Sequence, residues 1–99
     1  MSALIQAAMG YYTVMANNSA YSMMMGNNAR LGLLGYASNL GAMAGNGMDN
    51  VSFKALADMD TKLELQAITD SFNYKYSKAM LEKLKKMQEE DDNHLNYMA

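Results

Sequence analysis

Apolar residues recur at helical spacing over the second half of the chain, and this is its longest regular pattern. Neither glycine nor proline interrupts the sequence between residue 50 and Gln88, so the pattern predicts one long helix that Asn50 or Ser52 can cap. We expect this helix to fray in or just after the acidic run Glu89–Asp92, because negative charge near a helix C-terminus opposes its dipole. We call the apolar stripe on this helix the ridge; its members are Leu65, Ile68, Phe72, Tyr76, Met80, Leu84 and Met87.

The ridge does not follow the seven-residue repeat of a left-handed coiled coil. Leu65, Tyr76 and Met87 follow one another at intervals of about 11 residues, or about 3.67 residues per turn, which predicts straight or weakly right-handed packing. Two interpretations stay open: contact with other copies of the chain, or burial inside a plain intramolecular helical hairpin. The same helix carries a second, thinner stripe, so we expect contacts on more than one side. This second stripe comprises Leu56, Leu63, Ala67, Tyr74 and Leu81.

The first half of the chain shows a weaker helical pattern with more interruptions. Apolar spacing predicts short helices over about residues 2–16, 20–25 and 29–44. The pairs and triplets between them are typical of turns and helix ends, namely Asn17–Asn18 and Gly26–Asn27–Asn28. The first half is therefore predicted to be weakly ordered.

Small residues spaced by four lie at the end of this half. Ala37, Gly41 and Gly45 would form a face that lets another helix approach closely, with a flexible segment as the alternative. Gly45–Asn46–Gly47 is the clearest break and the predicted hinge. The predicted division is residues 1–47, a weakly ordered Gly/Ala/Met/Asn-rich region with helical segments, and residues 48–99, a long amphipathic helix with an acidic tail.

Charge is distributed unevenly between the two regions. Only Arg30 and Asp49 are charged among residues 1–50, whereas the other basic and acidic residues follow them. A net charge of −2 without a basic face argues against nucleic-acid binding. No run of about 18 apolar residues exists, which argues against a bilayer span. The uncharged first half nevertheless keeps a conjugative-pilin-like, membrane-associated subunit as an alternative.

Candidate chemistry is sparse. The chain has no cysteine, and its single histidine, His94, follows the acidic run, where a solvated helix end is favoured over a metal site. Methionine is abundant, with 12 residues, and packing at helical interfaces accounts for it better than copper binding does. No nucleophile–base set or phosphate-binding loop is present. We therefore expect a protein that is not an enzyme and that uses neither cofactor nor metal.

The segment LELQAITDSFNYKYSKAMLEKLKKM, residues 63–87, resembles the C-terminal helix of type III secretion filament subunits, especially those of the Hrp-pilus type. Residues 1–29 carry no charged side chain, and their Ser/Asn content resembles the uncleaved export signals of that route. The resemblance implies a pilus or needle subunit that is exported unfolded and polymerises outside the bacterium. It also implies that the long helix lines a channel. The implied polar lumen positions are Lys75, Lys78, Glu82 and Lys85.

The expectation is thus an all-α, helical hairpin-like subunit with a long C-terminal amphipathic helix, packed in a helical assembly that forms an export conduit. Its expected partners are other copies of itself, an export chaperone and components of the secretion apparatus. Its expected location is the bacterial cell surface or the medium, without a cleaved signal peptide. The chain departs from needle subunits in lacking their proline-containing turn between helices. A soluble helical adaptor or chaperone-like binding module is the main alternative.

Overall fold

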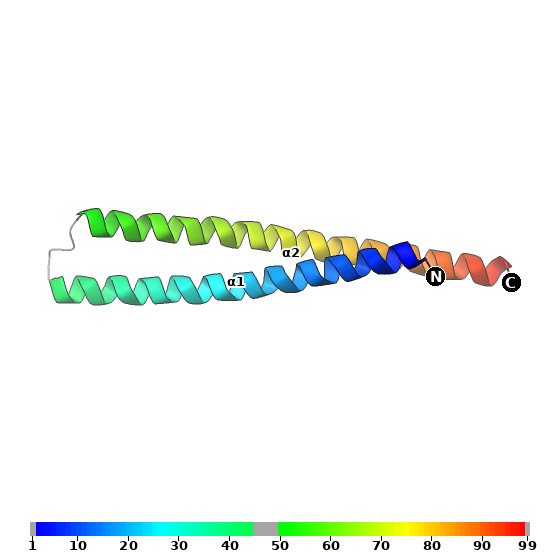
Figure 1. Cartoon of the computed structure of the whole chain (residues 1–99), viewed down its shortest axis with the longest axis horizontal. Helices are drawn as coiled ribbons and strands as arrows, with labels where there is room; N and C mark the ends of the chain where they lie inside the picture. Colours follow the sequence, from blue (N-terminus) through cyan, green and yellow to red (C-terminus); the bar gives the residue numbers. More distant parts are fainter. Residues whose placement is uncertain (1, 45–49, 99) are drawn as a thin grey trace. The chain divides into compact units, whose positions relative to one another are not determined.

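The fold is an all-α helical hairpin (Figure 1). The structure, a computed structural model, describes residues 2–44 and 50–98, and side chains over residues 2–39 and 53–94. Helix α1 spans Ala3–Ala44 and helix α2 spans Asn50–Met98; no strand occurs within the described ranges. The structure confirms the predicted all-α fold class. The predicted hinge at Gly45–Asn46–Gly47 lies outside the described residues.

Helix α1 is one continuous helix, so the prediction of three short helices is wrong. Asn17–Asn18 and Gly26–Asn27–Asn28 lie inside it, and all four asparagines are exposed. Each such residue costs a helix at most about 1 kcal/mol, and helices in proteins take most of their stability from packing. Contacts along the opposite face of α1 therefore outweigh these local signals.

Helix α2 confirms the prediction of a long uninterrupted helix, but it extends further than expected. It begins at Asn50 and continues through Glu89–Asp92 to Met98, so the predicted fraying at the acidic run is wrong. The helix dipole acts within the last turn. Because α2 ends at Met98, the acidic run lies before that turn, where it does not oppose the dipole.

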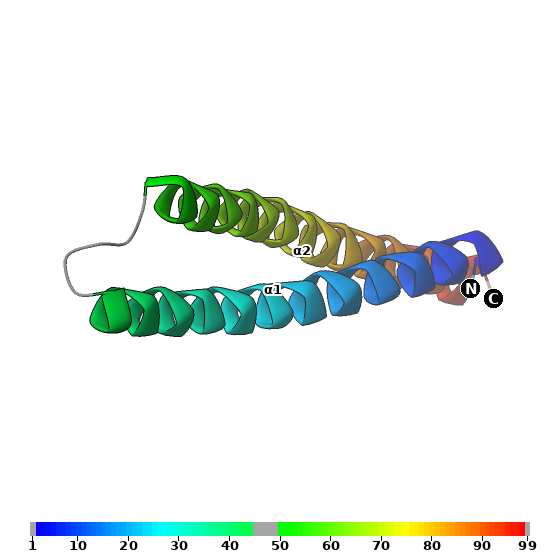
Figure 2. The same cartoon turned by 60° about the vertical axis from the view of Figure 1, so that its left-hand side comes forward.

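The chain forms two compact units. The terminal unit comprises Met1–Ala20 and Ser71–Ala99, and the central unit comprises Tyr21–Asp70. Each unit contains a segment of both helices, and inside each unit these segments lie side by side in both views (Figures 1 and 2). In the central unit, Ser22 of α1 contacts Asp70 and Arg30 contacts Asp60, so the two segments run antiparallel.

The contact between the helices, which we call the seam, repeats every seven residues. Every buried side chain and most half-buried side chains among the described residues of the two helices follow this period, which is that of a left-handed coiled coil. Every member of the second stripe belongs to it. On α1 the seam residues are Ile5, Met9, Tyr12, Ala16, Ser19, Met23, Gly26, Arg30, Leu33 and Ala37. On α2 they are Leu56, Asp60, Leu63, Ala67, Asp70, Tyr74, Ser77, Leu81, Leu84 and Gln88.

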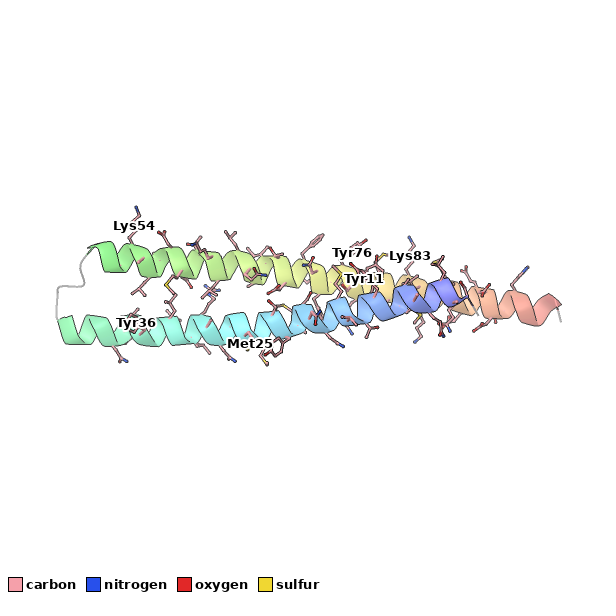
Figure 3. All side chains as sticks on the ribbon, in the orientation of Figure 1. Tyr11, Met25, Tyr36, Lys54, Tyr76 and Lys83 are labelled. Carbon is pink, nitrogen blue, oxygen red and sulfur yellow. The ribbon has the colours of Figure 1, made fainter. Side chains whose placement is uncertain are left out.

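The seam contains little apolar bulk. Among the described side chains, the only buried hydrophobic residues are Ala16 and Leu84, and three polar residues, Ser19, Asp70 and Ser77, are buried beside them. Large apolar side chains instead point away from the seam along both helices (Figure 3). Since burial of apolar surface is the dominant favourable term in folding, so thin a core leaves the chain with much unused apolar surface.

Candidate self-association surfaces

Most of the ridge lies outside the seam. Leu65, Ile68 and Phe72 are 59%, 60% and 67% exposed, which contradicts the alternative in which an intramolecular hairpin buries the whole stripe. Tyr76 and Met87 are also exposed. The remaining two members, Met80 and Leu84, are half-buried and buried respectively.

The difference in period between ridge and seam explains why one end of the ridge is buried. Between Leu65 and Met87, a stripe with about 3.67 residues per turn completes about six turns. A seam with about 3.5 residues per turn completes about 6.3 turns over the same residues. The ridge therefore rotates by roughly 100° relative to the seam along this stretch. It starts on the far side of α2 at Leu65 and meets the seam at Leu84, which is 7% exposed.

Four aromatic rings of the terminal unit form a row that joins the ridge to α1. Phe72 stacks on Tyr76 with ring centroids 6.3 Å apart, and Tyr76 meets Tyr12 edge-on at 6.0 Å. Tyr11 continues the row, 5.1 Å from Tyr12 (Figure 3 labels Tyr11 and Tyr76). A hydrogen bond with Tyr76, aided by desolvation, raises the pKa of Tyr12 above its usual value of 10.0. The apolar surface around Phe72 thus extends onto α1, which the sequence analysis missed.

The implied lumen positions share one property. Lys75, Lys78, Glu82 and Lys85 are all exposed, and the ammonium of Lys78 lies 5.6 Å from the ring centroid of Tyr74. Lys78 and Lys85 occupy a different side of α2 from Phe72, whereas Lys75, three residues after Phe72, lies on the same side. Whether they line a channel depends on how copies assemble, so that role stays a prediction.

Polar contacts cross the seam of the central unit. Arg30 donates from Nε to Asp60 Oδ1 at 2.9 Å, and both side chains are partly exposed. The carboxylate of Asp70, only 5% exposed, accepts hydrogen bonds from Ser22 Oγ at 2.5 Å and from Gln66 Nε2 at 3.0 Å. A buried polar group is costly unless it is paired, so the bond from Ser22 to Asp70, with the Arg30–Asp60 pair, favours one alignment of the two helices over shifted ones. The sequence analysis identified none of them.

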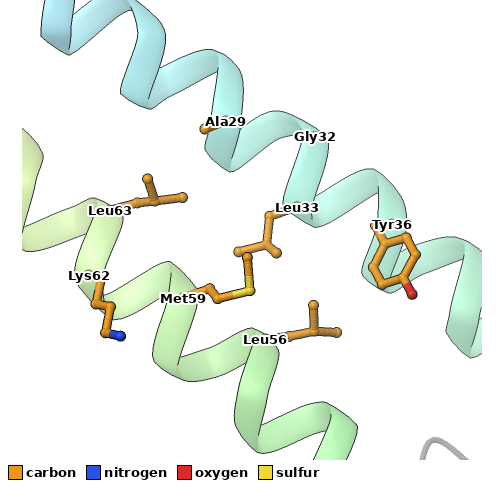
Figure 4. A pocket seen from close by; sticks show the side chains of 8 residues that line it. All are labelled: Ala29, Gly32, Leu33, Tyr36, Leu56, Met59, Lys62 and Leu63. Atoms are coloured by element: carbon orange, nitrogen blue, oxygen red, sulfur yellow. The ribbon is translucent and has the colours of Figure 1, made fainter.

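The central unit also contains an apolar groove between its two helix segments (Figure 4). The groove encloses about 540 Å³ and its only charged lining residue is Lys62. Gly32 lies along it, and a Cβ at Gly32 would meet nothing within 4 Å. Its remaining lining residues are Ala29, Leu33, Tyr36, Leu56, Met59 and Leu63.

The predicted small-residue face is described only in part. Ala37 is half-buried in the seam, Gly41 belongs to α1 without described surroundings, and Gly45 lies outside the described residues. Close helix packing at these three positions stays a prediction. At Gly10, Gly26, Gly32 and Gly35 an added Cβ would meet nothing within 4 Å, so no close approach inside the chain requires glycine there.

Over the described residues, no cluster of three or more metal-ligating His, Cys, Asp or Glu side chains occurs. Neither described helix contains a stretch both long and apolar enough to cross a bilayer. Comparisons with protein-family models, curated proteins and solved structures found no match to this chain.

Proposed function

We propose that this chain is the structural subunit of a self-assembling secretion filament, a pilus or needle that forms a protein-export conduit. The observation that carries the proposal is the exposure of Leu65, Ile68 and Phe72 on a hairpin whose described core holds only Ala16 and Leu84 as buried hydrophobic residues. An apolar surface of this kind on a soluble chain marks a contact with another molecule.

The energy available at the ridge suits assembly from a concentrated pool of subunits. Complete burial of one large apolar side chain contributes roughly 1.5–3 kcal/mol. With about 60% of each side chain still to be covered, Leu65, Ile68 and Phe72 offer about 3–6 kcal/mol per contact. Many such contacts along a polymer stabilise it, whereas one contact alone supports only a weak dimer.

The uncharged composition of the first half supports the export part of the proposal. Residues 1–29 carry no charge, and the seam is short of apolar bulk, so the hairpin can be unfolded at modest cost. A subunit that passes through a narrow channel unfolded and regains stability from its neighbours would have these properties. In this proposal it acts at the bacterial cell surface or in the medium.

Negative-stain microscopy of the purified protein, over a range of concentrations, tests the proposal. Filaments of uniform width that lengthen as concentration rises are the expected result. Chains that stay monomeric at high concentration, or that stop at a defined dimer, would contradict it.

One observation favours a second function, a soluble helical adaptor. The groove of about 540 Å³ in the central unit is apolar and open to one side, as a site for an apolar helix or peptide segment would be. An adaptor would form a complex of fixed mass with its ligand in light scattering, without growth at higher concentration. Substituting Met59→Glu in the groove would then abolish the complex, whereas filament growth through the ridge would be little affected.

A further inference from the structure

Helix α1 carries a second seven-residue stripe, on the side opposite the seam. We call it the outer stripe, and its spacing alternates between three and four residues, as in the core of a coiled coil. Each of its members is exposed in the structure. The outer stripe consists of Leu4, Ala7, Tyr11, Val14, Asn18, Tyr21 and Met25.

Charge is absent from the whole outer side of α1. In a solitary two-helix coiled coil, the positions facing away from the partner are normally charged. Between Ala3 and Gly35 of α1 the only charged residue is Arg30, which lies in the seam and pairs with Asp60. The outer stripe therefore has the composition of a contact surface on the side where solvent would be expected.

We infer that the outer stripe packs against the outer stripe of a second copy, helix α1 against helix α1. This deepens the proposed function by assigning a second self-association surface beside the ridge. An open polymer needs each subunit to use more than one contact, and the ridge alone supplies one.

The seven-residue repeat and the absence of charge together indicate that the partner of the outer stripe is helix α1 of a second copy. A sustained seven-residue repeat is matched by another helix, because knobs of one helix fill the holes of the other. The exposed side of α2 near the ridge includes Lys75, Lys83 and Lys86, whose charges an apolar partner would have to desolvate. The outer side of another α1 brings no charge, and Asn18 of each copy can form hydrogen bonds with the other.

The exposed area of the outer stripe is a substantial part of what a specific contact needs. Its large apolar side chains are 50–80% exposed, so each offers on the order of 100 Å². Together they offer roughly 500 Å², more than half of the ~800 Å² per partner of a typical specific interface. These side chains are Leu4, Tyr11, Val14, Tyr21 and Met25.

Disulfide cross-linking tests this inference cleanly, because the chain has no cysteine of its own. Single variants Ala7→Cys, Val14→Cys and Met25→Cys place thiols in the outer stripe, and Asn27→Cys is the control, exposed on another side of α1. Under mild oxidation of the full chain we expect covalent dimers between stripe positions, within one variant or in a mixture of two, formed at least about tenfold faster than with the control. A parallel pair links all three variants to themselves; an antiparallel pair links Ala7→Cys to Met25→Cys in a mixture.

Three outcomes would overturn the inference. In a mixture of Val14→Cys and Phe72→Cys chains, dominant linkage between the two would place the ridge, not α1, on the outer stripe. Flotation of the protein with phosphatidylcholine vesicles, with loss of stripe cross-links, would identify lipid as the occupant. Equal, slow linkage at stripe and control positions, in the single variants and in the mixture of Ala7→Cys with Met25→Cys, would leave the stripe without any partner.

The inference and the proposed function can fail separately. Adding Phe72→Asp to the stripe variants removes the ridge contact, so α1–α1 linkage should persist while filaments are lost. Filaments without stripe linkage would refute the inference alone. Stripe linkage in a wild-type background that never forms filaments would refute the filament function and leave the inference standing.

Discussion

The substitution Phe72→Asp separates the ridge from the seam. Phe72 is 67% exposed, and among the contacts described for its ring is the stack on Tyr76 at 6.3 Å. A charge at this position can remain in water in the single chain. In an assembly that covers the ridge, the same charge would be buried without a partner, which is costly.

The magnitudes follow from the exposed area. Complete burial of a large apolar side chain contributes roughly 1.5–3 kcal/mol, so the 67% of Phe72 that is still exposed is worth about 1–2 kcal/mol per contact. Loss of that contact weakens association on the order of 10-fold, before the cost of burying the new charge is added. The single chain loses only the stack on Tyr76, about 0.5–1.5 kcal/mol.

Circular dichroism and sedimentation velocity, run on the same samples, measure both effects. We expect Phe72→Asp to keep its helix content and lose assembly. Two controls complete the design: Leu84→Asp, in the seam at 7% exposure, should lose helix content, and Lys85→Asp, exposed and away from the ridge, should change neither property. The reasoning is refuted if Phe72→Asp unfolds as Leu84→Asp does, or assembles as the wild type does.

Three further predictions concern the seam and α1. The hydroxyl of Ser77 is fully buried and has no hydrogen-bond partner among the described residues. Ser77→Ala should therefore raise the free energy of unfolding, measured by chemical denaturation, by about 1–3 kcal/mol. A decrease in this free energy would mean that the hydroxyl is paired. Gly35→Ala adds a methyl group into open space and should raise the Tm of the single chain by about 4–8 °C, whereas a lower Tm would reveal a close contact there. Because the folded state raises the pKa of Tyr12, the associated stability is complete below pH 10.0 and is lost as pH rises through the higher folded value. Tyr12→Phe should therefore flatten the fall in Tm above that pH, and an unchanged slope would contradict the hydrogen bond with Tyr76.

The spacing of apolar residues along the sequence predicted the long helix and the stripe by which it contacts α1. The long helix α2 was readable from the absence of glycine and proline, and the members of its second stripe, such as Leu63 and Leu81, are seam residues. Over so short a stretch, however, periods of 3.5 and 3.67 differ by less than a third of a turn. Leu84 therefore fits the ridge by spacing and the seam by structure.

The features that were missed depend on which residues of the two helices meet. The bond between Ser22 and Asp70 joins residues far apart in sequence, and no local pattern sets the alignment of one helix against the other. The outer stripe was legible in the sequence but was hidden by the predicted break at Asn17–Asn18. Once α1 is known to be continuous, Asn18 becomes one member of a seven-residue repeat.

Sedimentation velocity of the unmodified protein, across a wide range of concentrations, tests most directly whether the apolar surfaces left outside the seam are contact surfaces. We predict a mass distribution that moves from the 10.9 kDa chain to progressively larger species as concentration rises. A single 10.9 kDa species at every concentration, with helix content intact, would contradict the account.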